Sequence, residues 1–207
     1  MNETSLRERK KLRTRHALID AALAGFAEHG FDGVTLDELC ARVEVSKRTF
    51  FRYFTGKEDV ASSPTQDLWT AFLAELEARP AGDGGPLLSF LGDRLLAALD
   101  AMPAEGWADR VLLSRRVAAA TPSVSAHDLQ FCDRTTRASL DVLHRRFAVP
   151  AAPDPRPRLA LDLLVAAFHH ALDEWTRAPS PTRDALAAHL RATLAAAPGA
   201  VTLTLAP

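Results

Sequence analysis

The sequence predicts an all-α protein of about nine helices, made of a three-helix N-terminal bundle and a longer helical region after it. Apolar residues recur at helical spacing, as they do at Ile19, Ala22, Leu23 and Phe26. Capping residues, glycines and prolines separate these runs. No alternating pattern typical of a strand is longer than VTLTL, residues 201–205, which we interpret as a tail.

The N-terminal bundle is defined by residues that start and stop helices. Gly30 ends the first helix, because glycine adopts the left-handed C-cap conformation without penalty. Thr35 and Glu38 form a capping box ahead of the second helix. The remaining signals are Ser46 as N-cap of a short third helix with Phe50 and Phe54 in its core, and Thr55 with Glu58 as a capping box that opens a fourth helix at Gly56-Lys57.

The longer region is also helical, and prolines mark its boundaries. Ser63-Pro64 predicts a cap followed by proline at a first helical position, so the fourth helix is expected to kink or restart there. Residues 80–86, rich in glycine, are expected to form a loop. The five later helices are predicted at residues 87–101, 105–120, 123–148, 157–177 and 182–197.

Charge is unevenly distributed, although 25 Lys and Arg against 26 Asp and Glu give a net charge near zero. Six of the first sixteen residues are basic, and a second basic group lies between residues 47 and 57. No apolar run is long enough to suggest a membrane span and the N-terminus does not resemble a signal peptide, so we expect a cytoplasmic protein. Cys40 and Cys132 lack a CxxC spacing, which predicts reduced thiols without a metal or disulfide.

The segment from Thr35 to Phe54 has the properties of a helix-turn-helix, whose second helix enters the major groove of DNA. Its apolar residues suffice to hold two short helices together, while basic and hydroxyl groups remain for the exposed face. The residues expected on that face are Lys47, Arg48, Thr49, Phe51 and Arg52.

The segment TLDELCARVEVSKRTFFRYFTGKEDV resembles the DNA-binding region of the TetR family of bacterial regulators, and the resemblance covers roughly residues 10–60. Glu44 and Phe51 depart from the pattern, since the family usually has glycine and tyrosine at these positions. The positions that match are Thr35, Ala41, Val45, Ser46, Thr49, Phe50, Tyr53, Phe54, Lys57 and Glu58.

The resemblance implies a role for each residue of a DNA-binding domain at residues 1–56. Thr35 would cap the second helix and offer its N–H and hydroxyl to a phosphate, and Ser46 would cap the recognition helix. Phe51 would either pack against the protein or touch a thymine methyl. Tyr53 would either contact a phosphate or close the small core. The base readers would be Lys47, Arg48 and Thr49, and the phosphate ligands Arg52, Tyr53 and Lys57. The basic arm from Arg7 to Arg15 would add non-specific attraction and reach a minor groove.

For residues 57–207 the resemblance implies a domain that senses a ligand and forms a dimer. A small apolar or amphipathic molecule is the expected effector. Its binding would make the protein release a palindromic operator, so the protein would be a repressor. The candidate pocket residues are Trp69, Phe72, Phe90, Arg115, Phe131, Phe168 and His169. The candidate dimer residues are Leu161, Leu164, Val165, Phe168, Leu172, Trp175, Leu186, Leu190 and Leu194. The alternative reading of these stripes is that they pack inside one chain.

Other function classes fit less well. An enzyme with an accessory DNA-binding head is disfavoured because the sequence has no Gly-rich phosphate loop, no HExxH and no GxSxG, and we expect no cofactor. His169 and His170 are adjacent and point to different helix faces, so no metal site is predicted. Two alternatives remain open. The protein could be a DNA-binding dimer that has no ligand or responds to a partner protein, and it could be an activator.

Overall fold

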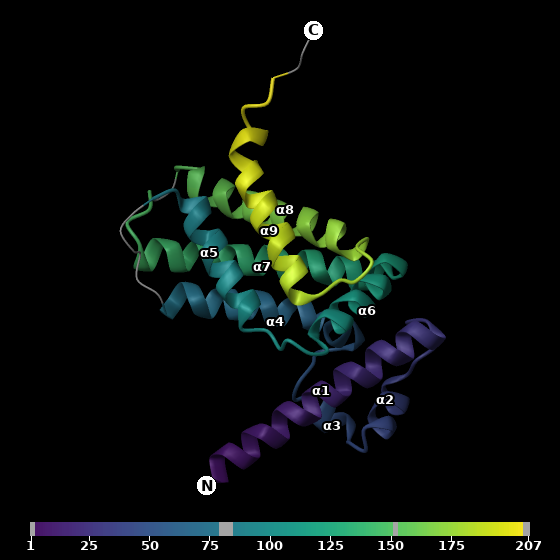
Figure 1. Ribbon diagram of the computed structural model, residues 1–207. Coiled ribbons are helices and arrows are strands. Elements are labelled where there is room, and N and C mark those ends of the chain that lie inside the picture. The colour runs from purple at the N-terminus through teal and green to yellow at the C-terminus, as the bar shows by residue number, and fades with distance from the viewer. Residues whose placement is uncertain (1–2, 79–84, 151–152, 205–207) are drawn as a thin grey trace. The chain divides into compact units, whose positions relative to one another are not determined.

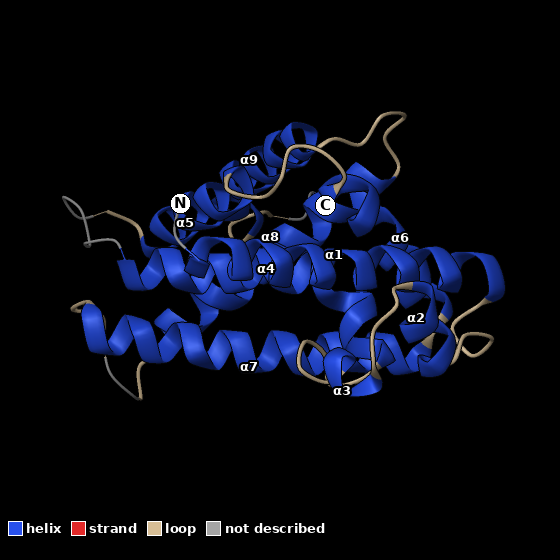
Figure 2. Cartoon of the chain, turned by 90° about the horizontal axis from the view of Figure 1, so that it is seen from below, coloured by secondary structure: helices blue, strands red, loops and turns tan. Residues whose placement is uncertain are grey.

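The computed structural model describes residues 3–78, 85–150 and 153–204. Within these ranges all regular structure is helical, which confirms the all-α class (Figures 1 and 2). The helices are α1 Glu3–His29, α2 Leu36–Arg42, α3 Lys47–Phe50, α4 Lys57–Ala78, α5 Leu87–Asp100, α6 Trp107–Ala120, α7 Pro122–Arg146, α8 Arg156–Thr176 and α9 Arg183–Ala200. Residues 80–84 of the predicted loop and residue 205 of the predicted tail lie outside the described residues.

The chain forms two compact units, each built from two stretches of sequence. Residues 1–66 and 109–131 form the first unit, and residues 67–108 and 132–207 form the second. The helices α4 and α7 therefore contribute to both units. The predicted boundary after residue 56 separates DNA binding from ligand sensing and dimerisation, and it stays a prediction. None of the described helices is long and apolar enough to cross a membrane.

The local signals of the first unit are confirmed in detail. The helix α1 ends at His29, and Gly30 follows with a left-handed φ of 76°. The Thr35 hydroxyl accepts the Glu38 N–H at 3.2 Å, while the Glu38 carboxylate accepts the Thr35 N–H at 2.8 Å. Ser46 Oγ accepts the Thr49 N–H at 3.1 Å, as an N-cap should.

The core of the first unit joins α1 to the helix-turn-helix. Phe50 and Phe54 are buried in it, as predicted, and their rings lie 5.5 Å apart. Leu23 of α1 and Leu39 of α2 belong to the same cluster. Cys40 is also part of this core, where burial raises the pKa of its thiol. Because these side chains come from α1, α2 and α3, the core fixes the orientation of the recognition helix on α1.

The capping partner predicted for Thr55 is wrong, and so is the predicted restart of α4 at Ser63-Pro64, while the alternative of a kink at that point stays a prediction. Asp59, and not Glu58, accepts the Thr55 N–H at 2.8 Å and the Thr55 hydroxyl at 3.1 Å. The helix also continues through Pro64 without restarting. Ser63 does not cap a new helix, because its hydroxyl donates to the Asp59 carbonyl one turn earlier, at 2.8 Å.

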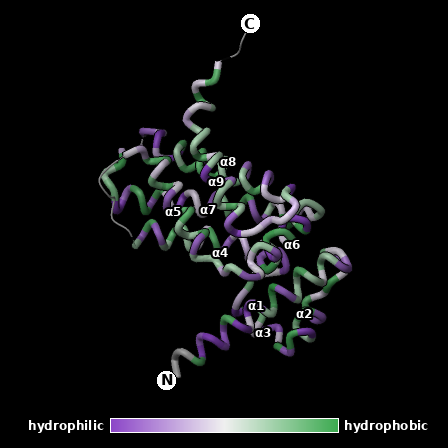
Figure 3. Tube along the Cα trace, viewed as in Figure 1, coloured by the Kyte–Doolittle hydropathy of each residue, from purple (hydrophilic) through white to green (hydrophobic). Residues whose placement is uncertain are grey.

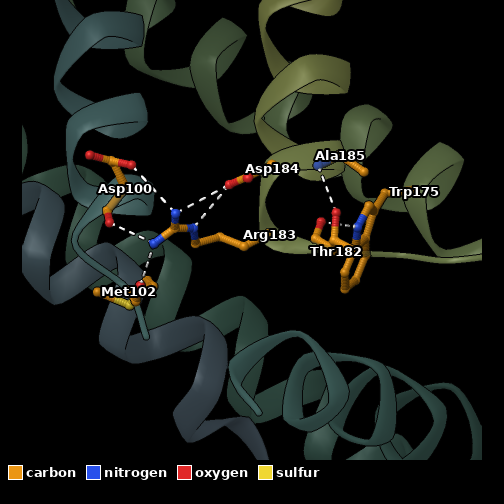
Figure 4. Close-up of polar contacts among 7 residues, drawn as sticks. All are labelled: Asp100, Met102, Trp175, Thr182, Arg183, Asp184 and Ala185. Atoms are coloured by element: carbon orange, nitrogen blue, oxygen red, sulfur yellow. Dashed lines mark hydrogen bonds and ion pairs between the residues drawn. The ribbon is translucent and has the colours of Figure 1, made fainter. Parts of the chain in front are cut away.

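The second unit is organised around α8 and α9, which pack on each other and on α5. The turn between them is held by the buried indole of Trp175, whose Nε1–H donates to the Thr182 carbonyl at 2.7 Å (Figure 4). Arg183 donates to the carbonyls of Asp100 and Met102, both at 2.9 Å. The guanidinium therefore satisfies carbonyls at the end of α5, which has no further helical turn to do so.

The apolar stripe predicted as a dimer interface is core of a single chain. Its buried members are Leu161, Leu164, Phe168, Leu172 and Trp175 of α8 with Leu186 and Leu190 of α9, none of them more than 2% exposed. The prediction is wrong for these seven, because such side chains have no surface left for a second chain. Val165 is half-buried. Leu194 is half-buried against α5, where a Cβ on Gly92 would lie 2.8 Å from Leu194 Cδ1.

Candidate DNA-binding surface

The recognition helix α3 is short and exposes its basic residues. Ser46 caps its first turn, and the buried ring of Phe50 anchors it to the core. Lys47 and Arg48 are exposed at its start, and Thr49 is half-buried with its hydroxyl 3.1 Å from that of Ser46. This arrangement presents two long cationic side chains on a fixed backbone, which suits contact with base edges in a groove.

Lys47 is engaged by a neighbouring acid. Its ammonium lies 2.9 Å from a carboxylate oxygen of Asp37 in the first turn of α2. Both side chains are more than half exposed. Exposed ion pairs of this kind contribute only about 0 to 1 kcal/mol, so a base edge or phosphate can replace Asp37 at little cost.

The two aromatic residues Phe51 and Tyr53, which follow α3, differ in their surroundings. Phe51 is 54% exposed and makes an edge contact with the Phe50 ring, so much of its apolar surface faces solvent. The Tyr53 ring packs against the core cluster. The Tyr53 hydroxyl accepts Arg52 Nη2–H at 3.2 Å, and the Arg52 guanidinium lies 5.1 Å from the tyrosine ring centre. Tyr53 therefore closes the core and also positions Arg52.

Thr35 has its donors occupied. The Glu38 carboxylate accepts both the Thr35 N–H, at 2.8 Å, and the Thr35 hydroxyl, at 2.9 Å. The backbone N–H and then the hydroxyl of Thr35 lower the pKa of Glu38. The capping contribution of Glu38 is thus present above the pKa of its unfolded state and lost as the pH falls through the lowered value. A phosphate role for Thr35 requires Glu38 to give up one donor, and that role stays a prediction.

Lys57 is tied to the protein's own backbone. Its ammonium donates to the Phe31 carbonyl at 2.7 Å and to the Val34 carbonyl at 2.9 Å, and it lies 4.4 Å from the Phe31 ring centre. Two of its three donors are therefore used within the turn between α1 and α2. The geometry favours a structural role over the phosphate contact expected from the sequence.

Replacing Lys57 by methionine should therefore act on stability. The free energy of unfolding is expected to fall by about 1 to 3 kcal/mol, because two partly buried carbonyls lose a charged donor. Denaturant titration measures this loss. The slope of log DNA affinity against log salt should not change, whereas a slope reduced by about 1 with unchanged stability would restore the phosphate role.

Glu44 occupies the tight turn between α2 and α3 in a left-handed conformation. Its φ is 54°, the one positive value among the described residues other than glycine. The turn thus requires the conformation that the family's usual glycine adopts freely, and a side chain with a Cβ is strained there.

Substituting Glu44 by glycine should raise the free energy of unfolding by roughly 1 kcal/mol. Relief of the backbone strain stabilises the folded state, and this gain exceeds the loss caused by the greater flexibility of glycine in the unfolded chain. Glu44→Ala is the matched control, because alanine loses the charge but keeps the strain. Equal stabilisation by both substitutions would assign the effect to charge and contradict the backbone explanation.

Three of the expected pocket residues come together in the second unit. The Trp69 ring makes edge contacts with Phe72 and Phe168, at 5.4 and 5.3 Å between ring centres. The cavity beside Trp69 and Phe72 measures only about 10 Å³, which is near the space of a single water. Sequence reasoning missed the hydroxyls of Thr135, Thr136 and Ser139 that line it, although all three recur on one stretch of α7.

The other expected pocket residues lie elsewhere. Phe90 packs on Phe147, with ring centres 5.2 Å apart. His169 is exposed, and Arg115 and Phe131 belong to the first unit. Of the seven residues, Trp69 and Phe72 line the cavity of about 10 Å³ in the second unit. Helical spacing identifies apolar faces without saying which faces meet.

A wide apolar groove lies on the outer face of α8 and α9, and it also escaped sequence reasoning. Its volume is about 510 Å³, and Ala166, His170, Ala192 and Ala196 are exposed along it. Small side chains from both helices form most of its floor. The signal was available in the sequence as the alanines of α9 that follow the buried Leu190.

Comparison with known proteins agrees with this geometry. Residues 18–63 match the family model of bacterial regulatory proteins, tetR family. The transcriptional regulator TcmR of Streptomyces glaucescens is 33% identical over 179 residues, which cover 84% of this chain and 78% of TcmR. The negative regulator of the icaADBC biofilm operon in Staphylococcus epidermidis, IcaR, is 29% identical over 56 residues, 27% of this chain and 30% of IcaR.

Solved structures share the fold. A TetR-family regulator from Mesorhizobium loti superposes with a TM-score of 0.51 and 20% identity, covering 92% of this chain and 97% of that one. A transcriptional regulator from a Rhodococcus species gives a TM-score of 0.50 at 18% identity, covering 90% and 96%. These likenesses support the all-α architecture.

Proposed function

Because the chain belongs to the TetR family of bacterial transcriptional regulators, we propose that it is a homodimeric repressor. It binds a palindromic DNA operator through the exposed face of α3 and is released by a small apolar or amphipathic molecule. Residues 1–56 supply DNA binding and residues 57–207 supply sensing and dimerisation. The observation that carries the proposal is the pair Lys47 and Arg48, exposed on a helix that Phe50 anchors in the core.

The proposed contacts follow the chemistry of each residue. Lys47, Arg48 and Thr49 read base edges, and Phe51 offers its exposed ring to a thymine methyl. Arg52 and Tyr53, already paired with each other, contact phosphate from one position. Lys57 supports the site by holding the turn after α1.

A second copy of the chain is the proposed occupant of the groove on α8 and α9. The groove is lined mostly by small side chains on two long helices, with Glu174, His170 and His189 among them, and small side chains permit close approach of two more helices. A two-fold axis through this face would make the contact identical from both sides, and a two-fold symmetric dimer matches a palindromic operator of two half-sites.

Effector binding is proposed for the region of Trp69, where apolar rings meet the hydroxyls of α7. A ligand has to open this packing, since the cavity of about 10 Å³ holds no small molecule. The ligand would lower the DNA affinity at most by the factor by which it binds the opened form more tightly than the closed form. The repressor role is supported by IcaR, named a negative regulator. A cytoplasmic location follows from a DNA target.

The proposal is tested by selecting bound sequences from a pool of random DNA duplexes with the full chain. Enrichment of one inverted repeat supports a sequence-specific dimer, while enrichment of a single half-site supports DNA binding without the dimer. No enrichment would overturn the proposal. Placement of the selected site within or outside promoters in the genome then separates repressor from activator.

A further inference from the structure

The first half of α1 is an exposed helical segment with strong positive charge. Every side chain from residue 6 to residue 13 is exposed, and five of these eight residues are basic against one acid, Glu8. The hydrophilic colouring of these turns contrasts with the apolar second half of the same helix (Figure 3). The segment is helical from Glu3 onward.

This basic half of α1 faces the recognition element across a cleft of about 520 Å³. One wall is formed by α1, where Arg7, Lys11 and Thr14 share a helix face at i, i+4 and i+7 spacing. The other wall is formed by Arg52 and Tyr53 with their neighbours. The cleft residues are Arg7, Glu8, Lys10, Lys11, Thr14, Val45, Thr49, Arg52 and Tyr53, which include four cations and a single carboxylate.

We infer that this cleft holds one phosphate strand of duplex DNA, so that α1 grips the backbone beside the groove that α3 reads. The inference rests on the proposed function. Guanidinium, ammonium and hydroxyl groups are the side chains that proteins direct at phosphates, and here they come from both walls. The strand would thus be held from two elements that share one core.

The helical form of the segment selects the phosphate strand over the minor groove. An α-helix with its side chains is about 10 to 12 Å across, whereas the minor groove of B-DNA is about 6 Å wide. A helix therefore does not enter that groove unless the DNA is widened. Contacts made in the cleft add affinity and salt dependence equally for all sequences, because phosphates carry no sequence information.

The test uses the full chain with both Arg7 and Lys11 changed to glutamine, and a duplex selected as operator beside a scrambled one. The slope of log affinity against log salt is expected to fall by about 2, once for each lost phosphate contact. Affinity for both duplexes should fall by the same factor. The charge-conserving variant Arg7→Lys/Lys11→Arg should keep the original slope, and Arg137→Gln/Arg145→Gln on α7 is the charge-matched control.

The outcomes separate this inference from the proposed function. An unchanged slope in the glutamine variant, with salt-dependent binding by the original chain, would overturn the cleft. A selective loss on the operator alone would also overturn it, because that result assigns base contacts to α1. If the original chain shows no preference for any selected duplex, the proposed function fails instead. Circular dichroism checks that the exposed substitutions leave the helices intact.

Discussion

Replacing Arg48 by alanine should lower affinity for the operator by about 5- to 150-fold, the equivalent of 1 to 3 kcal/mol for one lost bidentate base contact. Arg48 is exposed at the start of a helix that the core holds in place, so its removal should not disturb the fold. Affinity for a scrambled duplex should change much less. Lys47→Ala should act in the same direction, with Asp37 left without its ionic partner.

Titration of both duplexes at one salt concentration measures this effect. Arg137→Ala, on an exposed position of α7, serves as the control for removing an arginine. Equal losses on operator and scrambled DNA would show that Arg48 touches only the backbone, and would remove Arg48 as a reader of sequence.

Placing a charge in the α8–α9 groove should separate the proposed dimer into folded monomers. Ala166→Glu and Ala192→Glu each introduce a carboxylate at an exposed position of the groove. Burying an unpaired charge costs several kcal/mol, which raises the dissociation constant of the dimer at least about a hundredfold. Operator affinity should fall with it, because each monomer reads only one half-site.

Sedimentation and circular dichroism distinguish the possible interfaces. Ala195→Glu, exposed on α9 outside the groove, should stay dimeric. Leu164→Glu should unfold the chain, because Leu164 is fully buried in the core. If Ala166→Glu and Ala192→Glu remain dimers, the interface lies on another face.

Local helix chemistry was predictable from the sequence because it depends on near neighbours. The capping box of Thr35 and Glu38 and the cap of Ser46 follow rules that span three residues. The choice between Glu58 and Asp59 as partner of Thr55 depended on side-chain reach within one turn, which the pattern does not encode.

Long-range packing was not predictable in the same way. The stripe from Leu161 to Trp175 has the same period whether its own chain or a second copy covers it, and the structure shows its own chain. Lys57 closes the second basic group of the sequence, yet its partners are carbonyls more than twenty positions earlier. The family's usual glycine at position 44 indicated that Glu44 would be strained. The positive φ of Glu44 explains this, because glycine adopts that conformation freely.

The ratio of affinities for the selected operator and for a scrambled duplex of equal length, at one physiological salt concentration, tests the central claim most directly. A reader of DNA sequence should prefer its operator by about a thousandfold or more. We predict that ratio for the full chain, and a ratio lowered by about 5- to 150-fold in Arg48→Ala. Equal affinity of the full chain for both duplexes would contradict it.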